Sequence, residues 1–242
     1  MSIDGILKTR THRPWELPNK NWKYYQEWNN TIFLHWKVDE KELQKLVPND
    51  LEINLFEGSP WVSLVAFTME RIRPKNLPAF SPISNFHEIN IRTYVKYNGK
   101  PGVYFLSIEG GNSISCQIAR SLSELPYRYS NINRKNGYYH SSNSEFSDKI
   151  EMKYKIGDNL VKKNELDIWI TERYALFQDT ENSVNSFEIH HIEWPMNALG
   201  ITQLNIDYPR FNHLINPSPK RIAYSTGVQV IAWDKVQHRK QL

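Results

Sequence analysis

This 242-residue chain has one cysteine, no membrane-length apolar run and little net charge. The lone Cys116 excludes an internal disulfide and any metal site built from several cysteines. It falls in a segment with helical periodicity, so we expect a buried structural thiol rather than a catalytic one. No apolar run approaches the roughly 20 residues of a membrane span. Residues 1–5 lack the basic and apolar parts of a secretion signal. We therefore expect a cytoplasmic protein with no membrane partner.

The charge balance argues against a nucleic-acid partner. The chain has 30 basic and 26 acidic residues, which leaves a formal net charge of only +4 although the pI is near 9.0. Lysine-containing segments such as 96–100 and 149–155 interleave charge with other groups. That pattern is typical of a solvated strand face or turn, not of a track for phosphates.

Sequence signatures of metal, phosphate and hydrolase sites are also missing. No HxH or HExxH motif occurs, and His190 and His191 cannot both ligate one metal because adjacent strand residues face opposite sides. Gly110 and Gly111 precede a helical segment, where we expect a turn and a helix cap rather than a phosphate loop. There is no GxSxG nucleophile elbow, although a Ser-His-Asp arrangement stays open. We predict no metal and no cofactor.

Aromatic residues, by contrast, are abundant: 8 Trp, 13 Tyr and 10 Phe favour strands and pocket linings. Along residues 88–95 the side chains of Glu88, Asn90, Arg92 and Tyr94 project to one side, opposite a mostly apolar set. Such a polar face suits either open solvent or the interior of a barrel wide enough for a ligand. We favour the interior, although the pattern does not identify the ligand.

The chain is β-rich with a few short helices, and we expect one domain over residues 1–242. The helical segments are 39–47, 113–123 and, by spacing, 166–177. In the second helix, Ile114, Ile118 and Leu122 recur every four residues and predict one buried stripe. Expected strands are 51–56, 61–70, 88–95, 103–109, 150–156, 187–194 and 222–233, with turns at 99–102 and at Asn136-Gly137.

Several motifs stand in fixed order at residues 12–15, 60–63, 85–95, 102–107, 119–120, 125–128, 171–174 and 224–228, and so span nearly the whole chain. Together they resemble the YqjF-like family of uncharacterised bacterial proteins. Membership implies a fold like that of acetoacetate decarboxylase, a mainly β, double-sheeted barrel or cone around a central pocket. It does not imply that enzyme's reaction.

The decarboxylase carries a proline followed by two lysines, the first of which forms an imine while the second depresses its pKa. The matching stretch here looks like Pro126-Tyr127-Arg128. A phenol cannot form a Schiff base, so the imine route is lost unless another lysine enters the pocket. Lys96 and Lys100 flank a turn, where we expect them to be solvated.

These residues suggest a division of roles. Glu88 would act as acid or base, Tyr127 would donate a hydrogen bond to a developing oxyanion, and Arg92 would hold a carboxylate or enolate. Glu88 and Arg92 lie roughly 13 Å apart along the strand. We therefore expect them to line one pocket wall at different depths. The alternative is that each pairs with a cross-strand charge.

The other candidate substrate-binding residues are Asn90, Tyr94, Arg128, Arg120, Arg13 and Trp61. Arg120 and Arg128 would add positive potential that favours an anionic ligand, although Arg120 serves equally well as a helix anchor. Arg13 either caps the pocket from the N-terminal arm or stacks on Trp15.

Two functions fit this pattern. One is an enzyme that acts on an organic keto acid by acid–base or enolate chemistry without a Schiff-base lysine. The other is a non-catalytic binding protein for a small anionic or aromatic metabolite. A desolvated Glu88 that faces a void would favour catalysis, whereas Glu88 locked against an arginine would favour binding. Homo-oligomerisation is left open.

Overall fold

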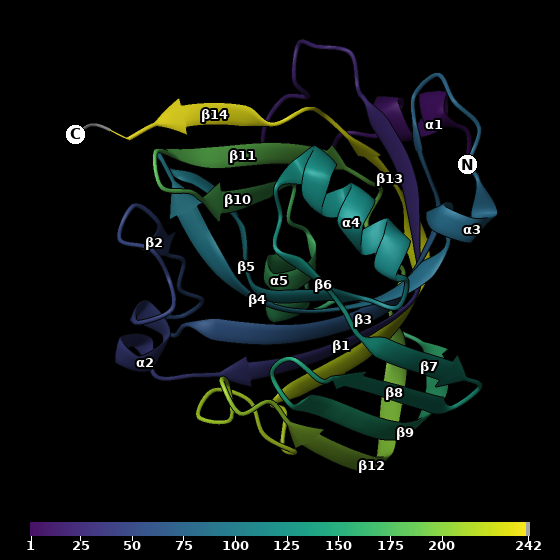
Figure 1. The fold of residues 1–242 in the computed structure, drawn as a ribbon, viewed down its shortest axis with the longest axis vertical. Helices are drawn as coiled ribbons and strands as arrows, with labels where there is room; N and C mark the ends of the chain where they lie inside the picture. Colours follow the sequence, from purple (N-terminus) through teal and green to yellow (C-terminus); the bar gives the residue numbers. More distant parts are fainter. Residues whose placement is uncertain (241–242) are drawn as a thin grey trace.

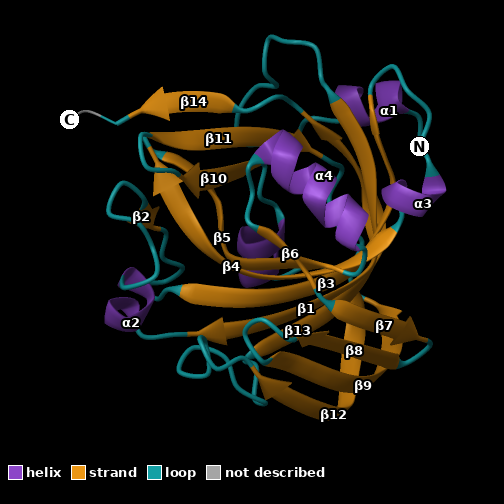
Figure 2. Cartoon of the chain, in the orientation of Figure 1, coloured by secondary structure: helices purple, strands orange, loops and turns teal. Residues whose placement is uncertain are grey.

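The computed structural model describes residues 1–240, in which β-strands predominate (Figures 1 and 2). The helices are α1 (Ile3–Lys8), α2 (Glu40–Gln44), α3 (Ser81–Ser84), α4 (Ser113–Ser123) and α5 (Glu165–Thr171). The strands are β1 (Tyr24–Lys37), β2 (Glu52–Ile53), β3 (Trp61–Pro74), β4 (Phe86–Tyr97), β5 (Lys100–Gly110), β6 (Tyr127–Tyr129), β7 (Asn131–Lys135), β8 (Tyr138–Asn143), β9 (Asp148–Asn159), β10 (Ala175–Asp179), β11 (Ser183–His190), β12 (Asn197–Asp207), β13 (Arg221–Ala232) and β14 (Val236–Arg239). None of these helices is long and apolar enough to cross a membrane.

The strands form one sheet that turns back on itself. Its order is β14-β11-β10-β5-β4-β3-β1-β13-β12-β9-β8-β7, and β11 also pairs with β13. The additional pairing closes β1, β3, β4, β5, β10, β11 and β13 into a ring, while β12, β9, β8 and β7 continue as a second layer beneath it (Figure 1). This architecture confirms the predicted mainly β, double-sheeted cone.

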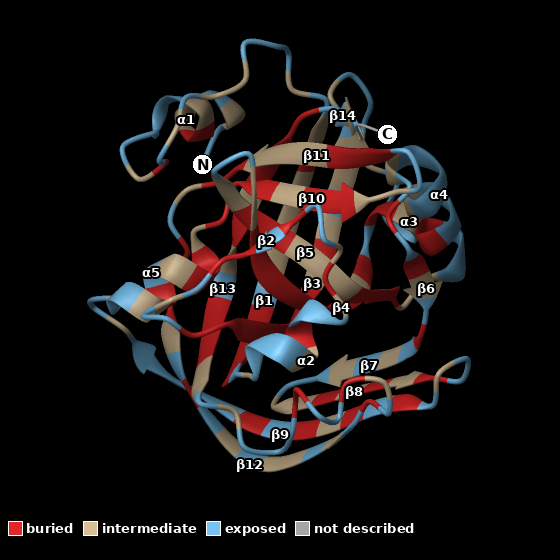
Figure 3. Ribbon diagram, turned by 90° about the vertical axis from the view of Figure 1, so that its left-hand side faces the viewer, coloured by how far each residue is buried: buried red, intermediate tan, exposed pale blue. Residues whose placement is uncertain are grey.

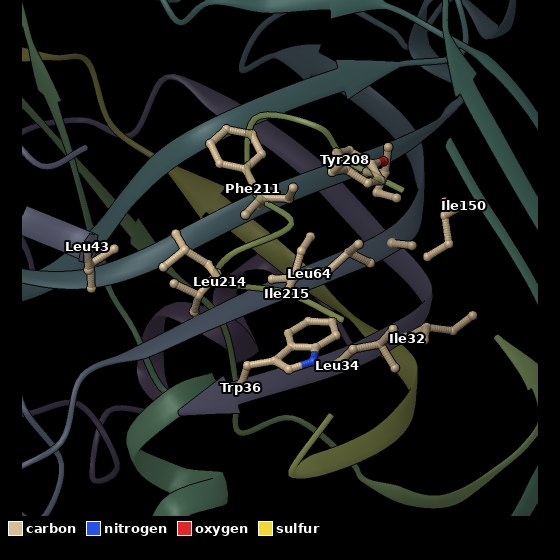
Figure 4. Close-up of a cluster of buried hydrophobic side chains, with 14 of the residues drawn as sticks. Ile32, Leu34, Trp36, Leu43, Leu64, Ile150, Tyr208, Phe211, Leu214 and Ile215 are labelled. Atoms are coloured by element: carbon tan, nitrogen blue, oxygen red, sulfur yellow. The ribbon is translucent and has the colours of Figure 1, made fainter. Parts of the chain in front are cut away.

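The largest apolar core lies between the ring and the second layer (Figure 4). Ile32 and Leu34 of β1 and Leu64 of β3 meet Ile150 of β9 there, and each is 1% exposed or less. Because strand side chains alternate, β4 sends Ile89 and its alternate neighbours toward this core and the opposite set toward the inside of the ring. Both faces of β4 and of β3 as far as Met69 are therefore largely buried (Figure 3).

Helix α4 lies over the ring beside β5 and β6, and its orientation corrects the sequence prediction. The aliphatic stripe is not buried, because Ile114, Ile118 and Leu122 are 57%, 39% and 59% exposed. Ser115 and Cys116 face inward instead. A Cβ added at Gly110 of β5 would lie only 2.6 Å from Cys116 Sγ. The close approach of helix to strand admits small residues and turns the large ones outward.

Turn chemistry sets the ends of the hairpins. Asn136-Gly137 joins β7 to β8 as predicted. The β4–β5 turn is Asn98-Gly99, with φ values of 49° and 76°, so β5 begins at Lys100, inside the predicted turn. Both residues have the positive φ that a type I′ hairpin turn requires. The predicted helix 166–177 ends at Thr171, and the chain continues into β10.

Candidate functional site

A cavity of about 200 Å³ lies within the ring, lined by residues from every ring strand and from α4, α5 and β6. Most of the lining is apolar and much of it aromatic, including Trp28, Phe67, Phe105, Phe187 and Trp194. The polar side chains in the lining include Glu88, Arg92, Tyr127, Arg173 and His191. An apolar wall with a few converging polar groups is the usual composition of a small-molecule site.

Glu88 on β4 is a desolvated carboxyl at the cavity wall, with 2% of the residue exposed. The Tyr127 hydroxyl donates to Oε2 at 3.0 Å, and the Asn90 amide donates to Oε1 at 3.2 Å. Burial raises the pKa of Glu88 to about 7, against the opposing effect of these two hydrogen bonds and of the Arg92 charge. Both protonation states are thus populated near neutral pH, which suits proton transfer.

Tyr127 is held in place by its backbone. Strand β6 pairs in parallel with β5, and Arg120 Nε on α4 donates to the Tyr127 carbonyl oxygen at 3.1 Å. Burial raises the pKa of the phenol well above its ordinary value, so the hydroxyl stays a hydrogen-bond donor. Arg120 itself lies outside the cavity lining and acts as an anchor between helix and strand.

Two buried guanidinium groups line the same cavity. Arg92 and Arg173 are 9% and 7% exposed. Among residues 1–240, no carboxylate lies within ion-pair distance of either, and Arg92 Nε and Arg173 Nε and Nη2 have no hydrogen-bond partner. Burial, with the nearby Arg92 charge, lowers the pKa of Arg173 to about 10. Buried charges are normally paired, and guanidinium groups without a carboxylate partner can bind an anion.

Two residues of the predicted polar face of β4 support the site without lining it. Asn90 is 3% exposed and donates to Glu88. Tyr94 is fully buried, its hydroxyl lies 2.5 Å from Ser63 Oγ, and its ring packs beneath the Arg173 guanidinium at 5.1 Å. Their side chains therefore orient the carboxyl and one of the cations.

The remaining predicted candidates lie elsewhere. Trp61 packs with Tyr94 and borders a separate surface hollow. Arg13 pairs with Glu188 at 2.5 Å, and its guanidinium lies 5.0 Å from the Trp15 ring, which matches the stacking alternative. Arg128 stacks on Phe146 at 4.5 Å. None of the three lines the cavity.

Sequence reasoning did not assign Arg173, His191 or Lys235, all of which line the cavity. Arg173 belongs to the 171–174 motif of the family resemblance, but the sequence did not indicate that its side chain lines the cavity. Lys235 pairs with Glu124 at 2.5 Å, and its side chain is 23% exposed. Lys96 and Lys100 are both in ion pairs outside the lining.

Two other chemistries find little support in the described residues. Cys116 is buried, and burial raises the pKa of its thiol to about 11, which disfavours the nucleophilic thiolate. Within residues 1–240 no three His, Cys, Asp or Glu side chains gather where they could hold a metal ion.

The fold is that of the acetoacetate decarboxylase-like proteins. Acetoacetate decarboxylase from Legionella pneumophila aligns with a TM-score of 0.64 at 14% identity, over 98% of this chain and 95% of that one. The enduracididine biosynthesis enzyme MppR, solved in complex with pyruvate, aligns with a TM-score of 0.63 at 10% identity, over 93% of each chain. Identities this low establish a shared fold and nothing further.

Sequence similarity identifies the family. Residues 25–229 match the model of DUF2071, a family described as an uncharacterized conserved protein. The chain is 31% identical to the protein YqjF of Bacillus subtilis (strain 168) over 225 residues. This alignment covers 90% of this chain and 93% of YqjF. The chain therefore belongs to the DUF2071 family, and the predicted resemblance is confirmed.

Proposed function

We propose that this protein is an enzyme that enolises a small keto acid by acid–base chemistry. The observation that carries the proposal is Glu88, a carboxyl whose pKa is raised to about 7 in a cavity with two unpaired arginines. Glu88 is desolvated, and its hydrogen bonds come from Tyr127 and Asn90 rather than from an arginine. That arrangement favours catalysis over a structural ion pair.

The two arginines would bind one end of the substrate. Arg92 and Arg173 would hold the carboxylate of the keto acid, since guanidinium groups bind carboxylates through two parallel hydrogen bonds. The structural neighbour MppR was solved with pyruvate, a keto acid of the proposed class. Its likeness to this chain covers the fold, so it supports the substrate class by analogy alone.

Glu88 and Tyr127 would act on the reacting atoms of the substrate. Enolisation breaks a C–H bond next to the keto group, its electron pair forms the new C=C bond, and the carbonyl oxygen gains negative charge. Glu88 would transfer a proton in this step, and the Tyr127 hydroxyl would turn from Glu88 Oε2 to donate its hydrogen bond to the developing oxyanion. The positive charge of Arg92 would further stabilise the enolate.

An imine is not part of this proposal. The stretch Pro126-Tyr127-Arg128 resembles the one that carries the decarboxylase's reactive lysine, with Tyr127 in place of that lysine, and a phenol does not condense with a ketone. Lys235 lines the cavity, but its ammonium is paired with Glu124 at 2.5 Å. An amine held in an ion pair is a poor nucleophile.

Deuterium exchange tests the function. Pyruvate and 2-oxobutanoate are incubated with the protein in D₂O, and loss of the C3 proton signal is followed by NMR. Wild type should accelerate exchange, and Glu88→Gln should lower the enzymatic rate on the order of 100-fold, the usual contribution of one acid–base group. The matched control is Glu109→Gln, because Glu109 is also a buried glutamate but lies outside the cavity lining.

Equal rates for wild type and Glu88→Gln would refute the proposal. The aromatic lining favours the second candidate, a binding protein for a small anionic or aromatic metabolite. In that case a keto acid or aromatic acid raises the melting temperature by mass action. No exchange above the protein-free rate would then be seen for any acid that binds.

A further inference from the structure

His191 lines the same cavity as Glu88 but comes from a different part of the ring. It follows β11 directly and is 1% exposed. Its ring packs 4.9 Å from the Tyr174 ring and 5.6 Å from the Trp194 ring, measured between centroids. The adjacent His190 lies outside the lining, and its Nε2 lies 2.9 Å from the Ile6 carbonyl oxygen.

One hydrogen bond fixes the tautomer of His191. Its Nδ1 lies 2.7 Å from the carbonyl oxygen of Ile192. A carbonyl can only accept, so Nδ1 carries the hydrogen, and in the neutral ring Nε2 carries the lone pair. No described residue forms a hydrogen bond with Nε2, which leaves this lone pair for a ligand in the cavity.

Enolisation is assisted when a base at carbon acts together with an acid at oxygen, and two separate groups can reach both atoms of the substrate at once. We propose that His191 is the base that removes the proton from carbon, while Glu88 in its acid form protonates the carbonyl oxygen. This inference rests on the proposed function and assigns its second catalytic residue.

The step balances without any further reactant. Nε2 takes the proton as the C–H bond breaks, the C–H electrons form the C=C bond, and the carbonyl oxygen takes the proton of Glu88. The products are the enol, an imidazolium on His191 and a carboxylate on Glu88. When the step runs in reverse after His191 has exchanged its proton with solvent, the keto acid is restored with a solvent hydrogen on carbon.

The surroundings of His191 suit this role. Burial lowers its pKa, and the His12 and Arg13 charges lower it further, so the resting ring is neutral and basic. The buried Glu172 carboxylate and the Ile192 hydrogen bond act in the opposite direction and would stabilise the imidazolium as it forms. Glu172 is itself fixed by the Tyr174 hydroxyl at 2.7 Å and by Lys163 at 2.6 Å.

The test compares His191→Gln with His190→Gln in the exchange assay. The two histidines are adjacent and buried, but His191 alone of the pair lines the cavity. His191→Gln should lower the rate about 100-fold, as loss of a general base does, and His190→Gln should keep it within about threefold of wild type. Keto-acid titration and thermal unfolding of each variant show that the site is folded.

The pH profile gives a readout that a purely structural role would not change. Wild type should show an acidic limb below pH 6.5, from protonation of His191, and a basic limb near 7, from ionisation of Glu88. His191→Gln should lose the acidic limb and Glu88→Gln the basic one. In ¹⁵N NMR, His191 Nε2 should have the shift of an unprotonated ring nitrogen and respond to added pyruvate.

The outcomes separate the two claims. If wild type exchanges and Glu88→Gln does not, while His191→Gln exchanges normally and keeps its acidic limb, the role of His191 is wrong and the function stands. If wild type exchanges no keto acid, both fail. A protonated Nε2 in the NMR spectrum at pH 8 overturns the tautomer and with it the base.

Discussion

Replacing Glu88 with Gln should change how stability depends on pH. The pKa of this carboxyl is about 7 in the folded protein, compared with 4.5 for an ordinary glutamate. Between these values the folded state keeps a proton that the unfolded state has lost. The contribution of Glu88 to stability is therefore fully present below pH 4.5 and is lost as the pH rises through 7.

The size of the effect follows from the two pKa values. The difference of 7 − 4.5 = 2.5 corresponds to about 3 kcal/mol at 1.36 kcal/mol for each pKa unit. Glutamine cannot ionise, so the free energy of unfolding of Glu88→Gln minus that of wild type should increase by about this amount between pH 4 and pH 8. Taking this difference cancels the other titrating groups that both proteins share.

Urea unfolding at half-unit steps of pH measures the difference. Glu16→Gln is the control, because Glu16 is an exposed glutamate outside the cavity lining. For Glu16→Gln, the free energy of unfolding minus that of wild type should change little between pH 4 and pH 8. A difference for Glu88→Gln that stays constant from pH 4 to pH 8 would show that Glu88 ionises as an exposed carboxyl does, and would refute the electrostatics of the site.

Three further predictions concern the same cavity. Arg92→Met should weaken keto-acid binding by roughly 2 to 4 kcal/mol in calorimetry, as truncation of buried charge partners does. The melting temperature of the free protein should change less. Unchanged affinity in a variant that unfolds readily would show that Arg92 stabilises the fold and does not bind the ligand. Tyr127→Phe removes a hydrogen bond that lowers the pKa of Glu88, so the basic limb of the exchange profile should move to higher pH, and an unmoved limb would contradict the contact. Borohydride with acetoacetate should trap no adduct, and a mass increase mapped to Lys235 or another lysine would establish an imine.

Local patterns predicted one of the strands that line the cavity. The period of two in β4 placed the Glu88 and Arg92 side chains on one face, and all four members of that face are buried. The same reasoning failed for α4. Ile114 has the spacing of a buried stripe, but the helix approaches β5 at Gly110 too closely for large side chains. Periodicity records which residues share a face, whereas packing decides which face turns inward.

The far side of the cavity could not be predicted because it depends on pairings distant in sequence. Strand β10 joins β5 in parallel over two residue pairs, and β11 closes the ring on β13 over two more. These contacts bring Arg173 and His191 to the cavity that Glu88 lines. No period or spacing in the chain specifies such long-range closure, so both residues lay outside the predicted site.

A crystal structure of the protein with bound pyruvate tests the central claim most directly. The account predicts that the pyruvate carboxylate contacts Arg92 and Arg173 and that its keto oxygen lies within hydrogen-bond distance of Glu88 or Tyr127. The methyl group should then face His191 Nε2. Pyruvate found outside the cavity, or bound in it with its carboxylate away from both arginines, would contradict the account.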